Sequence, residues 1–394
     1  MFTDADKEQI AKRGSSVEGV TKQIQNFVDG FPPLQLMKPA TEGHGVIVTD
    51  KAEQDRLVKQ YEGLSADKTI YKFVPASGAA SRMFKALFAF MGSYSGTDEE
   101  YEKFSSGEAH TDVFHFFKHI HDFAFYDDLK EAFRADNLSL EEAHLRRRYT
   151  DILRALLTSD GLSYGELPKG LLKFHQYEAG GRTPTEEHLV EGAHYAKGSD
   201  QVVRLHFTVS PEHRTKFEQH IESVKGKFEE QFGVTYKVSF SEQKPATDTI
   251  AVDLENEPFR NGDGSLLFRP AGHGALIANL DEIHGDLVFI KNVDNVVPDH
   301  LKGETYVFKK VIAGKLLEIQ QKTFDYLNKI DNGWSDDLES ELVDFCQNEL
   351  NIELPEVYSH KSSDEKRDFI HQKLNRPIRV SGMVGNIGDP GGGP

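Results

Sequence analysis

Short apolar runs rich in β-branched residues alternate with helical stretches, and this alternation constrains the fold more than any other feature. The runs have the length of strands, and apolar residues recur at helical spacing between them. Strands separated by helices of moderate length form a mostly parallel sheet covered on both faces. We therefore expect an α/β fold with strands at "IYKFV" (70–74), "VVRLHFTV" (202–209), "TYKVSF" (235–240), "TIAV" (249–252), "DLVFIKNV" (286–293) and "PIRVSGMV" (377–384).

Helical patterns surround these strands. Val17, Val20 and Ile24 recur at three- and four-residue steps before Gly30, and "DKAEQDRLVKQYEGL" (50–64) resumes that spacing. We expect an N-terminal helical region over residues 1–66 and an α/β domain over 67–394. Within that domain we expect a helical insertion at about 86–164 and a helical segment at about 307–375. The final "GDPGGGP" reads as an open loop, so we expect the natural protein to continue beyond it.

Charge and composition limit the kinds of partner and the cellular location that we expect for this chain. The 46 Lys and Arg residues against 64 Asp and Glu give a net charge of -18, which repels polyanions, so nucleic acid is not expected as a partner. No uninterrupted apolar run of about eighteen residues predicts a membrane span, and no export signal opens the chain. The single cysteine, Cys346, fits a reducing compartment, and we expect a cytoplasmic location. The oligomeric state stays open.

The loop after the first strand is the first candidate site. Ligands of open α/β sheets bind where a strand turns into the next helix, because backbone N–H groups are unpaired there. Small residues let phosphate approach the main chain, and an arginine stabilises its charge. An ordinary tight turn explains the same pattern equally well. The residues concerned are Ser77, Gly78, Ala79, Ala80, Ser81 and Arg82.

Three further segments carry candidate ligand contacts, each with a plain alternative. Lys169 in "LPKGLLKF" is a cation at a fixed turn, or a solvated surface lysine. Gly272 and His273 in "RPAGHGAL" form a turn that can close over a sugar or base, or a simple glycine turn. Asp294 follows a predicted strand, where a carboxylate can hold Mg²⁺ or merely support a turn.

Taken in order, these segments resemble the sugar-1-phosphate nucleotidyltransferases, above all the uridylyltransferases. The resemblance rests on "PASGAASRM", "PKGLL", "FSEQKP", "RPAGHGAL" and "IKNVDNV", over about residues 67–85 and 165–300. The whole chain also resembles a bacterial family called domain of unknown function 4301. The first resemblance implies a three-layer, Rossmann-like nucleotide-diphospho-sugar transferase core of GT-A type, with a mostly parallel mixed sheet.

The resemblance also implies roles for single residues. Gly78, Ala80 and Ser81 match the nucleotide and phosphate loop, with Arg82 and Lys169 as catalytic cations. Gln243 matches a base contact, Gly272 and His273 match base or sugar contacts, and Asp294 matches the metal ligand for Mg²⁺. The sequence departs from the family pattern at two positions: Ala80 stands where the family usually has glycine, and Ala275 where it commonly has aspartate.

The implied activity is Mg²⁺-dependent transfer of a nucleotidyl group, with uridylyl expected, from a nucleoside triphosphate to a sugar 1-phosphate, releasing pyrophosphate. Two alternatives remain open. One is a glycosyltransferase that consumes a nucleotide-sugar, and the other is a non-catalytic protein that binds a nucleotide or sugar phosphate. The sugar and the base are not indicated by the sequence.

Overall fold

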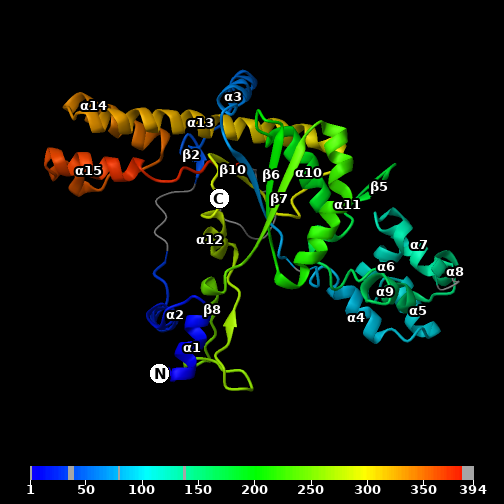
Figure 1. The fold of residues 1–394 in the computed structure, drawn as a ribbon. Helices are drawn as coiled ribbons and strands as arrows, with labels where there is room; N and C mark the ends of the chain where they lie inside the picture. The colour runs from blue at the N-terminus through cyan, green and yellow to red at the C-terminus, as the bar shows by residue number, and fades with distance from the viewer. Residues whose placement is uncertain (1, 34–39, 79, 136–138, 384–394) are drawn as a thin grey trace. The chain divides into compact units, whose positions relative to one another are not determined.

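The computed structural model describes residues 2–33, 40–78, 80–135 and 139–383 of an α/β protein (Figure 1). The chain forms two compact units, and each unit is built from two stretches of sequence. One unit comprises residues 1–32 and 69–300, and the other comprises 33–68 and 301–394. This division differs from the sequential one at residue 67, because helices far apart in sequence pack together.

A four-stranded, all-parallel sheet forms the centre of the first unit. Its strands are β3 (Ile70–Pro75), β6 (Val202–Val209), β7 (Thr235–Glu242) and β10 (Leu287–Ile290). They lie in the order β10-β3-β6-β7, which confirms the expected parallel α/β arrangement. Because all four strands run the same way, the loops after them meet at one edge of the sheet.

Two helices cover one face of this sheet, α10 (Pro184–Tyr195) and α11 (Arg214–Phe232), as Figure 1 shows. Apolar residues from alternate strand positions, such as Val203, Leu205 and Phe207, face these helices and are fully buried. Helix α10 begins at a capping box, in which Thr183 and Glu186 satisfy each other's backbone N–H groups and Pro184 takes the first helical position.

Helices occupy the segment for which the sequence predicts an insertion. They are α4 (Lys85–Ser93), α5 (Asp98–Ser105), α6 (Thr111–Lys118), η1 (Ile120–Asp122), α7 (Tyr126–Ala135), α8 (Leu140–Leu145) and α9 (Tyr149–Leu157). Aromatic rings fill their common core: Phe117 and Tyr149 lie 4.5 Å apart, and Phe90 and Phe104 lie 5.0 Å apart, centroid to centroid. The aromatic residues of this module therefore serve its packing.

The N-terminal helices α1 (Asp4–Lys12) and α2 (Val17–Asp29) pack on a small antiparallel pair, β8 (Thr249–Ile250) and β9 (Phe268–Arg269). The strand predicted at 249–252 is therefore only two residues long, and it lies outside the parallel sheet. The buried carboxylate of Asp6 binds Arg260 at 2.8 Å, and that hydrogen bond lowers its pKa well below the ordinary value. This pair ties the first helix to a residue 254 positions away.

Short elements complete the first unit. The hairpin of β4 (His175–Tyr177) and β5 (Gly180–Arg182) precedes α10. The remaining pieces are η2 (Lys169–Leu171), η3 (Pro211–His213), η4 (Pro245–Thr247), η5 (His273–Leu276), α12 (Ile277–Leu280) and η6 (Asp299–Leu301).

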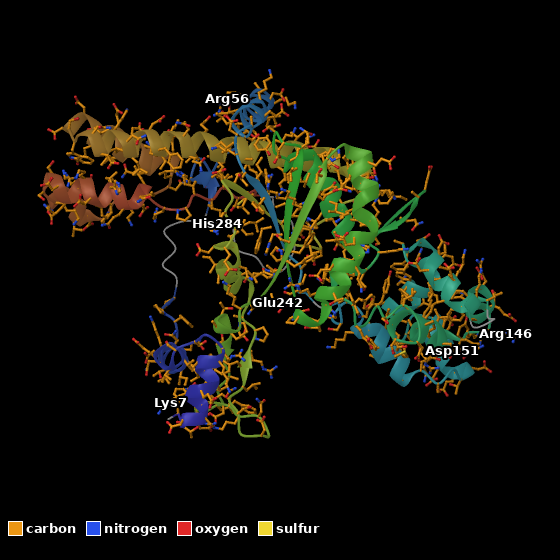
Figure 2. All side chains as sticks on the ribbon, viewed as in Figure 1. Lys7, Arg56, Arg146, Asp151, Glu242 and His284 are labelled. Carbon is orange, nitrogen blue, oxygen red and sulfur yellow. The ribbon has the colours of Figure 1, made fainter. Side chains whose placement is uncertain are left out.

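The second unit is mainly helical. It contains β1 (Thr41–Glu42), β2 (Gly45–Val46), α3 (Lys51–Leu64), α13 (Lys302–Asn332), α14 (Asp336–Asp344), a π-helix (Phe345–Glu349), η8 (Glu356–His360) and α15 (Ser363–Leu374). Helix α3 packs along α13, and Arg56, labelled in Figure 2, donates to Glu318 at 2.7 Å. None of the helices in the described residues is long and apolar enough to span a bilayer.

The last predicted strand, at 377–384, is wrong for the residues that the structure describes. Residues 377–383 form no strand, and Val384 lies outside the described residues. Ile378 and Val380 instead pack their side chains on the core formed by α13, α14 and α15. Helices thus take up the apolar residues that the sequence pattern assigned to a sheet.

Gly314→Ala should destabilise the second unit. A Cβ at this position of α13 would lie 2.2 Å from the backbone oxygen of Leu57 in α3, so the two helices would have to separate. We expect a loss of about 1–3 kcal/mol in the free energy of unfolding, measured with urea. Gly303→Ala in the same helix is the control, since nothing lies within 4 Å of its Cβ. Equal stability of the two variants would contradict this packing.

Candidate functional site

Lys169 and Asp294 meet at the carboxyl-terminal edge of the parallel sheet. Lys169 opens η2, and Asp294 follows β10. The Lys169 ammonium donates a hydrogen bond of 2.6 Å to Asp294 Oδ2, with 30% and 33% of the two side chains exposed. Because 125 residues separate them, only the tertiary fold brings these charges together.

The loop after β3 lies against the same lysine. The Lys169 N–H donates to Gly78 O at 3.1 Å, and the Ala80 N–H donates to Leu167 O at 3.4 Å. Two backbone hydrogen bonds therefore fasten this loop to the segment before η2. Gly78 is exposed, whereas Ala80 is fully buried in the core of the helical module, so its methyl group faces that core.

The other loop residues of the prediction differ in their placement. Ser77 and Ser81 are exposed, and Ala79 lies outside the described residues. Arg82 is exposed in the turn before α4, and its guanidinium makes no ion pair with the residues that the structure describes.

The first turns of α10 hold the loops that carry this lysine and this aspartate. Thr185 Oγ1 donates to Gly170 O at 2.7 Å, and His188 Nε2 donates to Val293 O at 3.1 Å. A Cβ on Gly170 would lie 2.8 Å from Phe217 and 3.0 Å from Val293, so the η2 turn needs glycine for this close approach. Helix α10 thereby fixes the residues next to Lys169 and Asp294.

Below the edge, Glu191 is buried between Lys72 of β3 and Lys291, which directly follows the adjacent strand β10. Glu191 Oε2 accepts from Lys72 Nζ at 2.8 Å and from the Tyr195 hydroxyl at 2.9 Å, while Oε1 accepts from Lys291 Nζ at 2.6 Å. Glu191 and Lys72 are fully buried, and Lys291 is 13% exposed. Burial alone would raise the pKa of Glu191, but the positive charges of Lys72 and Lys291 outweigh it and lower that pKa well below the ordinary value.

His188 is held neutral in the same interior. Burial, followed by the charge of Lys72, lowers the pKa of His188 well below the ordinary value. Its Nε2 carries the proton that Val293 O accepts, which leaves a lone pair on Nδ1. That nitrogen is buried without a hydrogen-bond partner among the described residues. The imidazole therefore acts as a donor that fixes the residue before Asp294.

The predicted base contacts lie elsewhere along the same edge. Gln243 follows β7, two strands from β3, and its Nε2 donates to Asp248 Oδ1 at 3.0 Å. Asn279 in α12 donates to Ser241 Oγ and to Glu242 O, both at 2.8 Å, which ties the turn of Gly272 and His273 to the end of β7. Figure 2 labels Glu242 at this place. No hydrogen bond that the structure describes joins Gln243, Gly272 or His273 to the Lys169–Asp294 pair.

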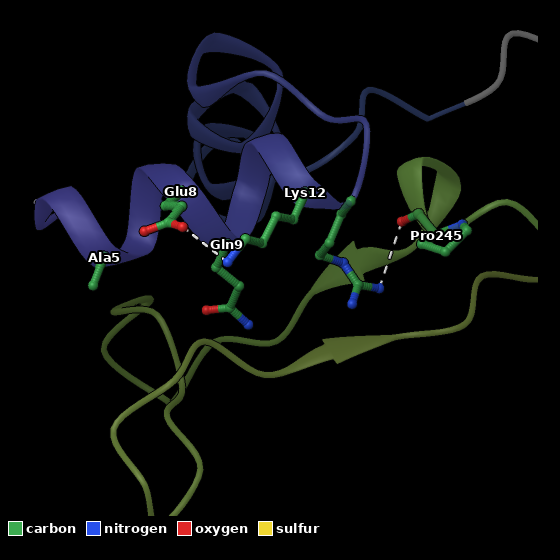
Figure 3. Close-up of a pocket in the computed structure, with 6 residues that line it drawn as sticks. Ala5, Glu8, Gln9, Lys12 and Pro245 are labelled. Carbon is green, nitrogen blue, oxygen red and sulfur yellow. Dashed lines mark hydrogen bonds and ion pairs between the residues drawn. The ribbon is translucent and has the colours of Figure 1, made fainter.

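A hollow beside α1 is a separate feature (Figure 3). Its charged walls already pair with one another: Glu8 binds Lys12 at 2.8 Å, and Arg13 binds Asp248 and approaches Pro245 O at 3.5 Å. Asp248 also accepts a hydrogen bond from Gln243, so the amide of Gln243 is already engaged within the protein. None of the predicted site residues lines the hollow.

Asp294 offers a single carboxylate at this edge of the sheet, and Lys169 already binds it. Mg²⁺ is commonly held by one or two carboxylates together with substrate phosphates. Asp294 supplies one carboxylate, and within the described residues no group of three or more His, Cys, Asp and Glu side chains is placed to hold a metal alone. The ligand would have to complete the coordination.

One family model matches residues 3–394, and its description is Domain of unknown function (DUF4301). The chain belongs to this family. Comparison with curated proteins gave no match, and comparison with solved structures gave none either.

The sequence analysis did not identify the buried polar residues of α10 in this DUF4301 chain. They lie in "RTPTEEHLVEGAHY", which was not assigned a role. The Thr-Pro-x-Glu start of this segment is a helix N-terminus signal. Polar residues follow at spacings of three and four, as in Glu187, His188 and Glu191. A charged face on a helix normally predicts solvent exposure, and the burial of Glu191 depends on Lys72 of β3 and on Lys291, which follows β10.

Glu191→Gln should destabilise the protein strongly. The change leaves the buried ammonium of Lys72 without its anionic partner, and breaking a buried pair typically costs about 3–5 kcal/mol. Urea unfolding measures the loss. Glu99→Gln removes the partner of Lys103 at a similar distance of 2.7 Å on an exposed helix, and it should stay close to wild type. Similar unfolding curves for the two variants would contradict the burial of the Lys72–Glu191 pair.

The stability of this DUF4301 chain should fall as pH drops below about 6.5. The pKa of His188 is lower in the folded than in the unfolded state, so the unfolded chain binds more protons below its own pKa. The contribution is complete above that pH and is lost at up to about 1.4 kcal/mol per pH unit below it. His188→Gln should make the pH dependence shallower between pH 7.5 and 5. A residual slope is expected, because burial also lowers the pKa of His206, His213 and His220. An unchanged slope in the variant would refute this assignment.

Proposed function

We propose that this chain transfers a nucleotidyl group, with uridylyl the expected one, from a nucleoside triphosphate to a sugar 1-phosphate, on a Rossmann-like core of GT-A type. The observation that carries the proposal is the junction of three remote segments at one sheet edge. Lys169 binds Asp294 through its side chain and Gly78 through its backbone. A cation, a carboxylate and an exposed glycine loop at the carboxyl ends of parallel strands suit a polyphosphate ligand.

The proposed reaction requires the protein mainly to position the two substrates and to neutralise their negative charge. A phosphate oxygen of the sugar 1-phosphate forms a bond to the α-phosphorus, and the bond from that phosphorus to the pyrophosphate oxygen breaks. No protein group has to form a covalent bond or accept a proton. Lys169 and Arg82 would neutralise the negative charge that accumulates on the phosphoryl oxygens, and the loop at Gly78 would hold the triphosphate.

Asp294 has two roles in this proposal. Without ligand it neutralises Lys169 across 2.6 Å. With ligand it would hold Mg²⁺ with Oδ1, which accepts no hydrogen bond from the described residues. The metal would supply charge stabilisation to the phosphates. Lys169 would contact the anionic ligand.

Lys169→Ala should lower turnover about a hundredfold with little change in melting temperature. Removing one positioned cation from a charged transition state typically has this effect. The stability effect should be small, because a pair with about a third of each side chain exposed contributes roughly 0–1 kcal/mol. Pyrophosphate release from UTP, Mg²⁺ and a panel of sugar 1-phosphates measures the rate.

Lys310→Ala is the matched control for this variant. Lys310 binds Glu62 at 2.7 Å with 24% of its side chain exposed, and it lies in the other unit. Its rate and melting temperature should match wild type. Sugar transfer from a UDP-sugar without pyrophosphate would instead indicate a glycosyltransferase. Stabilisation by UTP without turnover in any mixture would indicate a non-catalytic binding protein.

A further inference from the structure

A second polar group near the start of α10 is not used by the proposed reaction. Glu187 is fully buried in the first turn of α10, and its Oε1 accepts hydrogen bonds from His175 Nδ1 at 2.9 Å and from the Tyr177 hydroxyl at 2.8 Å. His175 and Tyr177 belong to the β4–β5 hairpin, which folds over the beginning of α10. Backbone pairing and helix capping therefore fix both partners of this carboxylate.

The Glu187 carboxylate is also held by the positive charge of Arg182 and by the protonated hydroxyl group of Tyr177. Arg182 Nη1 lies 3.6 Å from Glu187 Oε2 and binds both oxygens of Asp299 at 2.9 and 2.8 Å. Burial, and then the hydrogen bond to Glu187, raise the pKa of Tyr177 well above the ordinary value, so its hydroxyl remains a donor. The Asp299 N–H donates to the same hydroxyl oxygen at 3.1 Å. Tyr177 is thus fully engaged within the protein.

In this group, His175 is the residue with a ring nitrogen, Nε2, that makes no hydrogen bond within the described residues. Its Nδ1 donates to a carboxylate that can only accept, so in the neutral ring Nε2 carries the lone pair. The side chain is 16% exposed, and no described residue forms a hydrogen bond or an ion pair with Nε2. A ring nitrogen fixed from behind by a buried carboxylate is a preorganised acceptor, and its natural partner is a hydroxyl group.

The same helix turns connect this acceptor to the proposed site. Thr185 binds Gly170, next to Lys169, and His188 binds Val293, next to Asp294. Glu187 lies between Thr185 and His188 in α10, and it holds His175. One short stretch of helix therefore fixes the lysine turn, the aspartate loop and the histidine together.

We propose that His175 Nε2 accepts a hydrogen bond from a hydroxyl group of the phosphorylated ligand, so that the site selects polyhydroxylated phosphates such as sugar phosphates. This inference rests on the proposed function, because it assumes that Lys169 and Arg82 take the phosphate. His175 is then a specificity-determining contact, and Glu187 is a positioning residue that sets its tautomer.

The test compares ligands that share a phosphate but differ in hydroxyl groups. Isothermal titration calorimetry measures the Kd of glucose 1-phosphate, mannose 1-phosphate, N-acetylglucosamine 1-phosphate and methyl phosphate. His175→Asn is the informative variant, since its amide can keep the hydrogen bond to Glu187 while the Nε2 position is lost. His121→Phe, on an exposed histidine of the helical module, is the control.

We expect His175→Asn to weaken binding of the preferred sugar 1-phosphate about tenfold and to leave methyl phosphate within twofold of wild type, with an unchanged melting temperature. Sugar phosphate binding equal to wild type would overturn the inference, as would an equal loss for methyl phosphate. Wild-type protein that binds no sugar phosphate better than methyl phosphate would also overturn it, whether or not the variant folds.

The proposed function fails in a different way. Wild-type protein that binds a sugar phosphate through His175, but forms no pyrophosphate with any nucleoside triphosphate, would support the contact and refute the transfer reaction. Lys169→Ala should weaken methyl phosphate and sugar phosphates alike, because it removes the cation and leaves the hydroxyl contact.

Discussion

The site depends on the buried ion pairs that the carboxylate of Glu191 forms with Lys72 and Lys291. Taking ions out of water costs several kcal/mol each, and only good hydrogen-bonding geometry offsets that cost. A shift of α10 by one residue along the sheet would leave all three charges buried without partners. The helix can therefore occupy only one position on β3 and β10. The residues that are hydrogen-bonded to its first turns are fixed in place with it.

The functional proposals follow from this fixed helix. Thr185 sets the turn of Lys169, His188 sets the loop of Asp294, and Glu187 sets the ring of His175. The three contacts come from three residues within four successive positions of the helix, which face different sides of it. A buried, charged network thus supports partly exposed groups at the sheet edge, which is where open α/β folds bind ligands. Preorganised groups of this kind act without having to be ordered during the reaction.

Sequence reasoning predicted the parallel sheet and the helical segments, because periods of two and of three to four residues report local structure directly. It failed at 249–252 and 377–383, where apolar residues pack on helices or form only two paired residues. An apolar run shows that side chains are buried but does not identify their neighbours. Likewise the charged residues of α10 were passed over, since sequence alone shows no lysine beneath them.

By itself the sequence determined the fold class, the order of the strands along the chain, and the loops whose small or charged residues suit a phosphate. Only the tertiary structure decided which of those residues meet. Lys169 and Asp294 lie together and Gln243 turns to Asp248, because strand order and helix packing set distances that spacing along a chain does not encode. Only the tertiary structure decided the division into two units as well. In the second unit, α3 packs along α13 although more than two hundred residues of chain separate the two helices.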